Sequence, residues 1–485
     1  MKLIITGNAA NELNSTYCRN LCLIFFPGAK FPENQELTEK VPAVKLNIDE
    51  IGGNIECKAE IINNGNVYTG AGSVKTADYV SRVRAMKTAS GEAMLEAGGK
   101  MLGKLPPWGI MTGVRPAKLG RELRARGYRG EDFIRQVIKE FHVSPQKAAL
   151  LETVTAVEER AAVLAQPDTC SLYISIPFCP TRCAYCSFVS YATPKYMATL
   201  PAYLDVLCED IASMCEKIKE KGKRILTVYI GGGTPTVLDA SQLDRLLTTV
   251  RKCTDNTDLL EFTVEAGRPD TVTEEKFNVM LSHGVDRTSI NPQILNDSVL
   301  ERIGRKHTVD DFYRAYDIAR KSGINSINTD LIAGLPGSDF GIFSGTVDEI
   351  IRLSPDNVTV HTYCVKRSAD FTADAVLHGD TLGIYSYSGG DTSECVDYAQ
   401  EKLTDNLYKP YYMYRQKNAQ GNLENVGYAK DGKEGLYNIF IMEELQDIYA
   451  VGAGAVTKLV GGENSKITRI FEPKYTYEYL NSKKS

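Results

Sequence analysis

A short apolar run leads into three closely spaced cysteines in the stretch Tyr173-Ile-Ser-Ile-Pro-Phe-Cys179-Pro-Thr-Arg-Cys183-Ala-Tyr-Cys186. The run Leu172–Ile176 predicts a β-strand, and the cysteines fall on the loop that follows it. Thiolates spaced closely on one loop can wrap a single iron–sulfur cluster. Three of them leave one iron of a four-iron cluster without a protein ligand, and an open metal position is typical of a catalytic site.

Two other kinds of site use cysteines at short spacing. Structural zinc takes four ligands, and no fourth cysteine or histidine lies close by on the loop; Cys170 lies before the predicted strand. A redox dithiol fits Cys183-x-x-Cys186 alone, but it would not require Cys179. The spacing C-x3-C-x2-C therefore favours an open [4Fe–4S] cluster on these three thiolates.

Composition and charge are those of an ordinary globular protein. Of the 485 residues, 43% are hydrophobic and 24% are charged, and this length predicts two or three domains. The formal net charge of −5 argues against a nucleic-acid partner, which favours a basic face. No apolar run approaches the roughly 20 residues of a membrane span, and the N-terminal residues lack a signal-peptide pattern. We therefore predict a cytoplasmic protein, in which the scattered cysteines are small buried hydrophobes rather than disulfides.

Three regions differ in pattern, and we predict one domain for each. Residues 1–165 begin with the strand-like runs Val44–Ile48 and Ile55–Ile62 and continue into a helical stretch around Ala77–Leu102. They indicate an N-terminal α/β domain of unknown role. Residues 371–485 mix helix with a tyrosine-rich strand and predict a C-terminal α+β extension on the substrate side.

Residues 166–370 alternate short apolar strands with helical patterns, as in parallel β/α units. Six such strands are too few for a closed eight-unit barrel, so we predict a partial (β/α)6 barrel. In such folds chemistry gathers at the carboxyl ends of the strands. The predicted strands are Leu172–Ile176, Thr227–Ile230, Phe262–Glu265, Arg287–Asn291, Asn328–Ile332 and Val358–Tyr363; the helices are Leu200–Lys219, Ala240–Lys252, Glu274–Ser282, Val309–Lys321 and Phe340–Leu353.

Glycine and polar residues follow the other predicted strands. Gly231-Gly-Gly-Thr-Pro235 comes after the second strand, where glycines let a ligand approach the backbone, although a glycine triplet alone is more often only a tight turn. Glu265, Gln293 and Asp330 stand at the next strand ends, and their side chains can bond ribose hydroxyls. Arg305 lies among other charges and by itself is more typical of the surface. Because the strand ends share one edge of the barrel, we predict a ligand site there.

Together these motifs resemble the radical S-adenosylmethionine superfamily and, more narrowly, the oxygen-independent coproporphyrinogen III oxidases. The segments Trp108–Pro116, Arg415–Asn418 and Glu424–Ala429 look like the HemZ branch of that group, and with them the resemblance spans most of the chain. The barrel motifs that carry the resemblance are Tyr173–Phe188, Gly231–Pro235, Val264–Ala266, Gln293, Arg305 and Asn328–Pro336.

The resemblance implies two cofactors and a reaction. A [4Fe–4S] cluster on Cys179, Cys183 and Cys186 binds S-adenosylmethionine through its open iron and cleaves it to a 5′-deoxyadenosyl radical. The implied reaction is oxidative decarboxylation of two propionates of coproporphyrinogen III to vinyls in haem biosynthesis. The radical removes a β-hydrogen from each propionate, carbon dioxide leaves, and one electron passes to an acceptor. The implied cofactor-binding residues are Tyr173, Gly232 and Glu265 for the cluster-bound S-adenosylmethionine, and Tyr185, Gly233, Thr234, Gln293, Arg305, Asp330 and Cys364 for a second one.

Two departures from the resemblance concern substrate handling. Ser175 stands where the better-known branch has His, and Ser187 and Phe188 stand where that branch carries a further cysteine. The four carboxylates of the implied tetrapyrrole substrate call for basic partners. An electron donor such as flavodoxin or ferredoxin and a monomeric state are also expected. Candidate partners of the carboxylates are Lys366, Arg367, Arg415 and Lys417.

Two other functions stay open at this point. Related barrels with the same cysteine loop carry haem to other proteins, and a haem-binding chaperone is therefore an alternative. His361 and His307 are then candidate axial ligands, although a lone histidine is more often structural. The other alternative is a radical enzyme that acts on a different tetrapyrrole, such as haem.

Overall fold

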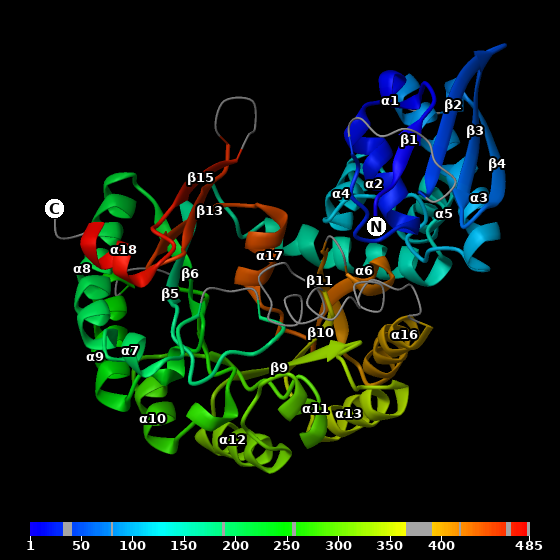
Figure 1. Cartoon of the computed structure of the whole chain (residues 1–485). Coiled ribbons are helices and arrows are strands. Elements are labelled where there is room, and N and C mark those ends of the chain that lie inside the picture. Colours follow the sequence, from blue (N-terminus) through cyan, green and yellow to red (C-terminus); the bar gives the residue numbers. More distant parts are fainter. Residues whose placement is uncertain are drawn as a thin grey trace. The chain divides into compact units, whose positions relative to one another are not determined.

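The computed structural model describes residues 1–32, 41–78, 81–186, 190–254, 259–364, 390–416, 419–461 and 467–482. The chain divides into two compact units (Figure 1). Unit 1 contains Met1–Thr153 and Tyr414–Glu424, and unit 2 contains the other described residues from Val154 onward. None of the described helices is long and apolar enough to cross a membrane.

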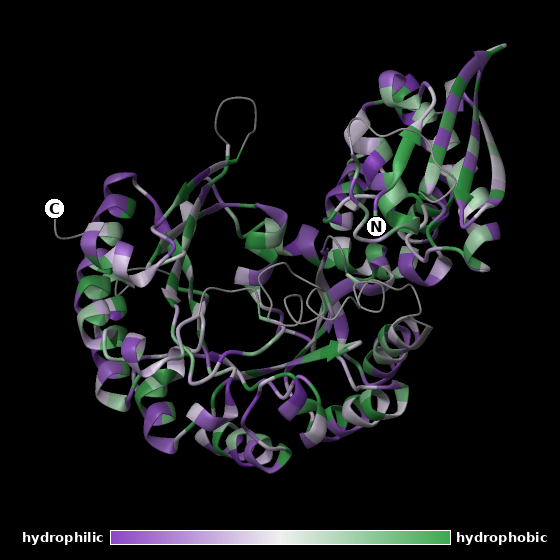
Figure 2. Cartoon of the chain, viewed as in Figure 1, coloured by the Kyte–Doolittle hydropathy of each residue, from purple (hydrophilic) through white to green (hydrophobic). Residues whose placement is uncertain are grey.

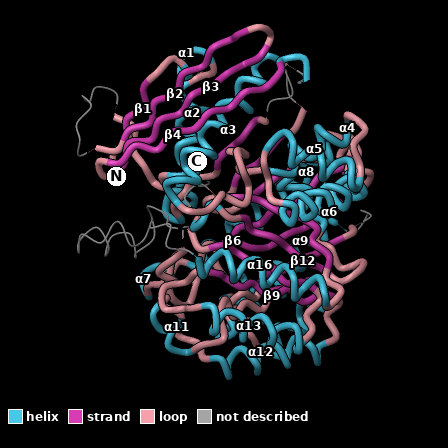
Figure 3. Tube along the Cα trace, turned by 90° about the vertical axis from the view of Figure 1, so that its right-hand side faces the viewer, coloured by secondary structure: helices cyan, strands magenta, loops and turns pink. Residues whose placement is uncertain are grey.

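Unit 1 is built on a four-stranded sheet in the order β1-β2-β3-β4, with β1 parallel to β2 and the other pairs antiparallel (Figure 3). The predicted strands and helix of this region are confirmed as β2, β3 and α3. Its strands are β1 (Ile4–Thr6), β2 (Ala43–Ile51), β3 (Asn54–Asn63) and β4 (Asn66–Lys75). Its helices are α1 (Ala9–Glu12), α2 (Ser15–Phe25), α3 (Arg82–Leu102), α4 (Pro116–Ala125), α5 (Gly130–Phe141) and α6 (Pro145–Ala162), the last of which ends in unit 2.

Buried and more exposed residues alternate along much of β2, β3 and β4, because successive side chains of a strand point to opposite faces. Figure 2 shows hydrophobic and hydrophilic residues interspersed in the strands of this unit. Helix α3 covers the apolar face at very short range. A Cβ atom at Gly72 of β4 would lie 2.2 Å from the carbonyl oxygen of Ala89 in α3. Glycine is therefore required there for the helix to pack on the sheet.

Unit 2 contains an eleven-stranded sheet in the order β11-β12-β10-β9-β8-β7-β6-β5-β13-β14-β15. The run from β10 to β13 is parallel throughout, so the fold is mixed α/β with a large, mainly parallel sheet. The six predicted strands are confirmed as β5 (Thr169–Ile176), β6 (Arg224–Gly232), β7 (Glu261–Glu265), β8 (Arg287–Ser289), β9 (Ser326–Ala333) and β10 (Asn357–Thr362). The remaining strands are β11 (Lys409–Arg415), β12 (Glu424–Ala429), β13 (Asp447–Val451), β14 (Val456–Leu459) and β15 (Thr468–Phe471).

The sequence pattern did not predict that β13 extends the parallel sheet beyond β5, where Tyr449 pairs with Leu172. As a result, strands of the predicted C-terminal region belong to the same sheet as the predicted barrel strands. The division into three domains with separate roles stays a prediction. Cys170 lies inside β5, at the amino end of the strand, and not before it.

The predicted helices between these strands are also confirmed. Figure 1 shows α8, α9, α10, α12 and α13 following one another along the outer side of the sheet. The described helices of unit 2 are α7 (Pro194–Met197), α8 (Leu200–Glu220), α9 (Ala240–Thr254), α10 (Glu274–Ser282), α11 (Asp297–Arg302), α12 (Val309–Ser322), α13 (Phe340–Leu353), α16 (Gly390–Asp405), α17 (Leu436–Glu443) and α18 (Thr476–Ser482).

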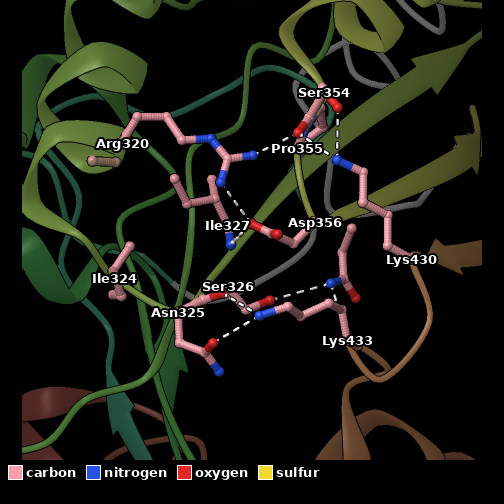
Figure 4. A network of polar contacts seen from close by, with 12 residues as sticks. Arg320, Ile324, Asn325, Ser326, Ile327, Ser354, Pro355, Asp356, Lys430 and Lys433 are labelled. Atoms are coloured by element: carbon pink, nitrogen blue, oxygen red, sulfur yellow. Dashed lines mark hydrogen bonds and ion pairs between the residues drawn. The ribbon is translucent and has the colours of Figure 1, made fainter.

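A polar network closes the amino ends of β9 and β10 (Figure 4). The carboxylate of Asp356 accepts hydrogen bonds from Arg320 at 2.8 Å and from the backbone N–H of Ile327 at 3.0 Å. Lys430 donates to the carbonyl of Ser354 at 2.9 Å, and Arg320 donates to the same carbonyl. The charged groups of this network thus have partners within the chain, which is typical of a stabilising rather than a catalytic end.

We expect Asp356→Ala to lower the free energy of unfolding by about 2–3 kcal/mol, since it leaves a buried N–H and a guanidinium without their acceptor. The matched control is Asp431→Ala, which removes an exposed carboxylate paired with Lys409 and should change stability by less than about 1 kcal/mol. Chemical unfolding of both variants measures the difference. Equal losses in the two variants would contradict the role given to Asp356.

Candidate active site at the carboxyl ends of the parallel strands

The cysteine loop begins where β5 ends and is fixed against the glycine run after β6. The backbone N–H of Gly233 donates to the carbonyl of Ile176 at 2.8 Å, and that of Thr234 donates to the carbonyl of Phe178 at 2.7 Å. The hydroxyl of Thr234 donates to the sulfur of Cys179 at 3.3 Å. The two predicted motifs, cysteine loop and glycine run, are therefore in direct contact.

The second cysteine lies beside a buried arginine that the sequence did not single out. Arg268 donates to the sulfur of Cys183 at 3.7 Å and to the hydroxyl of Thr181 at 2.8 Å. The backbone of the loop is held by Ala184, whose N–H donates to the carbonyl of Ile303 at 2.9 Å. Arg268 thus offers a positive charge next to a site that collects negative thiolates.

The donor set on this loop suits an iron–sulfur cluster. Burial raises the pKa of the Cys179 thiol to about 11, so the free thiol keeps its proton until a metal displaces it. Among the described residues, no three His, Cys, Asp or Glu side chains converge on a point for one metal ion. A [4Fe–4S] cluster does not require three side chains to converge on one point, because each thiolate binds a different iron. Hydrogen bonds to sulfur, such as those from Thr234 and Arg268, tune such clusters.

The glycine run packs closely against the residues beside it. Gly232 adopts φ +106°, a conformation that favours glycine, and a Cβ there would lie 3.0 Å from the hydroxyl oxygen of Ser175. A Cβ at Gly231 would lie 3.1 Å from a carboxylate oxygen of Glu265. The hydroxyl of Ser175 donates to the carbonyl of Ala453 at 3.0 Å. The serine that stands here in place of the histidine of the better-known branch thus packs against the loop after β13.

Three tyrosines stack beside Glu265. The ring centroids of Tyr173 and Tyr229 are 6.2 Å apart, and those of Tyr229 and Tyr437 are 4.5 Å apart, with interplanar angles of 20° and 22°. The hydroxyl of Tyr229 donates to the carboxylate of Glu265. Burial raises the pKa of Glu265 to about 7, although the bond from Tyr229 lowers it. Glu265 therefore changes its charge near neutral pH.

The surroundings of Asp330 lower its pKa, whereas those of Glu265 raise the pKa of that residue. Its carboxylate accepts bonds from the side-chain amides of Asn291 and Asn328, both at 2.7 Å, and lies 3.9 Å from a ring nitrogen of His361. Burial alone would raise the pKa of Asp330, but His361 and the hydrogen bonds from Asn328 and Thr359 lower it. Asp330 is thus held as a carboxylate that can accept bonds from ligand hydroxyls.

Gln293 combines backbone strain with an unsatisfied amide oxygen. Its φ is +65°, which is unusual for a residue other than glycine. The backbone is held by bonds to the carbonyl of Asp330 and from the N–H of Ile332, both at 3.0 Å. The side-chain oxygen is buried and has no hydrogen-bond partner among the described residues. Such an oxygen costs free energy unless a ligand completes its bonding, so Gln293 fits a ligand site.

Arg305 and His307 are buried behind the cysteine loop. Arg305 donates to the carbonyls of Asn291 and Gly267. Burial lowers the pKa of His307 to about 3, with further lowering by Arg305 and Arg268. Burial also raises the pKa of Tyr185, whose surroundings include Arg305 and Cys183. Arg305 is therefore a buried positive charge and not the surface charge that its neighbours in sequence suggest.

The structure brings together most of the predicted site residues at the carboxyl ends of β5–β9. Cys364 follows β10 and is buried, and the adjacent Tyr363 donates its N–H to the carbonyl of Ala333 at 2.8 Å. Arg415 belongs to unit 1, where it donates to the carbonyl of Met111 at 2.6 Å. Five predicted positions lie outside the described residues: Ser187, Phe188, Lys366, Arg367 and Lys417.

Sequence reasoning missed several polar and aromatic residues of the site: Tyr229, Arg268, Asn291, Asn328 and Tyr437. One signal could have found two of them. Tyr229 precedes Gly231 by two residues and Asn328 precedes Asp330 by two, so each pair points to the same face of its strand. Arg268, Asn291 and Tyr437 carry no such local signal.

Comparison with known proteins agrees with this arrangement. The Radical SAM superfamily matches residues 173–350. Among solved structures, coproporphyrinogen III oxidase HemN from Escherichia coli, described as a radical SAM enzyme, has a TM-score of 0.52 at 21% identity, covering 68% of this chain and 71% of that one. At this identity the likeness shows the fold.

Curated relatives narrow the family further. The chain is 31% identical over 296 residues to the heme chaperone HemW of Lactococcus lactis, over 60% of this chain and 70% of HemW. It is 39% identical over 378 residues to the oxygen-independent coproporphyrinogen-III oxidase-like protein HemZ of Bacillus subtilis, over 77% of this chain and 74% of HemZ. The chain therefore belongs to the radical SAM superfamily and, within it, to the family of HemZ-like proteins.

Proposed function

We propose that this protein is an oxygen-independent coproporphyrinogen III oxidase that converts two propionates of its substrate to vinyls by oxidative decarboxylation. The substrate is supported by the names of two similar proteins. HemZ is called oxygen-independent coproporphyrinogen-III oxidase-like, and HemN is called coproporphyrinogen III oxidase. The observation that carries the proposal is the contact between the cysteine loop and the ligand-ready residues at the strand ends, above all Thr234 on Cys179 and the unsatisfied oxygen of Gln293. In this proposal residues 166–370 act as the partial (β/α)6 barrel of a radical enzyme.

The cofactors of the superfamily would be held by the loop and the strand ends. When bound, a [4Fe–4S] cluster on Cys179, Cys183 and Cys186 together with S-adenosylmethionine supplies a radical that removes hydrogen atoms. Gly232, which lies beside Ser175, would present its backbone to the ligand, and Asp330 would accept bonds from hydroxyls. The main chemical work of these side chains is to orient the ligand and keep water out.

Glu265 and the tyrosine stack control charge beside this ligand. With a pKa of about 7, Glu265 is neutral in acid and a carboxylate above neutrality, and Tyr229 donates to it. A carboxylate at this place attracts the ammonium group of an amino acid, as in the methionine part of S-adenosylmethionine. Tyr173 and Tyr437 form an apolar wall that limits solvent access.

A haem chaperone is the second candidate, favoured by the 31% identity to HemW. His307 does not suit an axial ligand, because it is 3% exposed and lies among arginines. His361 lies near Asp330 with its side chain 27% exposed. For this candidate, a stoichiometric haem complex without turnover is the expected result.

The proposal includes partners and a location. A flavodoxin or ferredoxin supplies the electron, and the protein acts as a monomer on a tetrapyrrole. Thiolates that hold a cluster must stay reduced, which suits the reducing cytoplasm. An open cluster is exposed to oxidants, so activity is lost in air.

We expect the reduced, cluster-loaded protein to form vinyl products from coproporphyrinogen III, with loss of carbon dioxide, under anoxic conditions. Mass spectrometry of the products measures this, with haem offered in a parallel incubation. A product from haem alone identifies another tetrapyrrole as the substrate. Haem binding without a product from either substrate identifies a chaperone. Either of these two results contradicts the oxidase assignment.

Cys183→Ser is expected to abolish the cluster absorption at roughly 400 nm and all cleavage of S-adenosylmethionine, because a serine oxygen replaces one of the three thiolates. The control is Cys208→Ala on α8, outside the loop, which should keep both signals. Absorption and 5′-deoxyadenosine are measured after anoxic reconstitution. Persistence of both signals in Cys183→Ser would refute the cluster assignment.

The raised pKa of Glu265 predicts a pH dependence of stability. The folded state keeps a proton that the unfolded state releases between pH 4.5 and about 7, so stability falls as pH rises through this window. In Glu265→Gln, the decrease of the free energy of unfolding with rising pH should be smaller by up to about 3 kcal/mol. Denaturant unfolding of cluster-free protein at pH 5 and pH 8 measures it, with the exposed Glu275→Gln as control. Identical pH profiles for Glu265→Gln and the unmodified protein would rule out the raised pKa.

A further inference from the structure

Unit 1 contains a cavity of about 230 Å³, a volume that holds part of a small molecule. It lies between helices α3 and α4 and the segment Ile110–Pro116. This segment is part of Trp108–Pro116, one of the HemZ-like motifs for which the radical chemistry gives no role. The cavity belongs entirely to unit 1, and none of its lining residues belongs to the strand-end site.

Positive side chains dominate the lining. Arg84, Lys87, Arg115 and Lys118 line the cavity, and the only carboxylate with them is Glu122. Glu122 lies 3.6 Å from Arg84, with its own side chain 54% exposed. The whole chain has a net charge of −5, so this local excess does not follow from the overall composition. An anionic ligand in this cavity would be attracted by all four cations.

The base of the cavity is apolar and holds the cations in place. Ile110, Met111 and Phe141 line it and are buried. The guanidinium of Arg84 lies 5.1 Å from the ring centroid of Phe141, and the ammonium of Lys87 lies 5.2 Å from that of Tyr17. Cation–aromatic contacts of this kind orient a charge without neutralising it. A ligand of matching chemistry has an apolar body and negative groups at its edge.

The segment that forms one wall is built rigidly. The N–H of Ile110 donates to the carbonyl of Phe141 at 2.9 Å. Gly109 adopts φ +51°, and a Cβ there would lie 2.1 Å from that same carbonyl oxygen, so only glycine allows this close approach. Pro116 stands in the first turn of α4. The wall therefore keeps its shape without a ligand.

The same segment lines a second, much smaller cavity, of about 50 Å³, together with Arg415. Arg415 is 4% exposed and lies 5.6 Å from the ring centroid of Trp108. Its Nε has no hydrogen-bond partner among the described residues. Residues of two separate HemZ-like motifs, Trp108–Pro116 and the described pair Arg415 and Gln416, thus meet where unit 1 collects buried or half-buried positive charge.

We propose that the larger cavity binds an organic polyanion, that is, a small molecule with an apolar body and two or more carboxylates or phosphates. This site is additional to the proposed radical chemistry and does not depend on it. Carboxylates and phosphates both pair with arginine and lysine. A tetrapyrrole polycarboxylate and a nucleotide are therefore the two sources that an experiment must separate.

The test uses the full chain and two probes, coproporphyrin III and ADP. Titration calorimetry gives the affinity, and hydrogen exchange shows which backbone amides become protected. We expect one probe to protect residues 82–88 and 110–122. The double variant Lys87→Met and Lys118→Glu should bind that probe at least about tenfold more weakly, because two charge contacts are lost. The methionine keeps the aliphatic contact with Tyr17.

The control is the double variant Lys58→Glu and Lys75→Glu on β3 and β4, which does not change the cavity lining and should bind like the unmodified chain. Protection by coproporphyrin III alone identifies carboxylates as the recognised groups, and protection by ADP alone identifies phosphates. The proposal is overturned if neither probe protects these segments, or if the cavity variant and the control bind with equal affinity. Neither outcome bears on whether vinyl products form at the cluster.

Discussion

The parallel ladder of backbone hydrogen bonds from β5 to β10 is the constraint on which the candidate site depends. Parallel pairing forces the carboxyl ends of neighbouring strands to meet at one edge. Its register sets Ser175 opposite Gly231, and Glu265 opposite Ser289. Residues far apart in the chain therefore become neighbours without any specific side-chain attraction. The side chains at this edge are free to serve a ligand because the backbone already holds the strands together.

Polar groups are treated differently at the two ends of these strands. At the amino ends, Asp356, Arg320 and Lys430 satisfy one another and the backbone. At the carboxyl ends, the side-chain oxygen of Gln293 and both ring nitrogens of His307 have no partner among the described residues. Buried polar groups without partners lower stability. Those beside the cysteine loop lie where a bound ligand can complete their hydrogen bonding.

In unit 1, close packing of the sheet and α3 supports the proposed anion site. Its sheet and α3 pack so closely that Gly72 has no room for a side chain, and this rigid base supports the segment Trp108–Pro116. The superfamily match covers residues 173–350 only, whereas 378 residues align with HemZ. The features that separate this family from the wider superfamily therefore extend beyond the parallel sheet. The cationic cavity of this chain lies in that additional region.

The sequence by itself determined the six central strands, the helices between them, the cysteine loop and the residues Glu265, Gln293 and Asp330, although Asp330 lies inside β9 and not at its end. These features follow from local patterns, since apolar runs form strands and the residue after a strand lies at its end. Only the tertiary structure decided that β13 pairs with β5, that Arg268 reaches Cys183 and that Tyr437 stacks on Tyr229. Such contacts join segments distant in the chain, and no local pattern records which of many chemically equivalent partners will meet. The same reason explains Arg305, whose charged neighbours in sequence indicate the surface although the folded chain buries it.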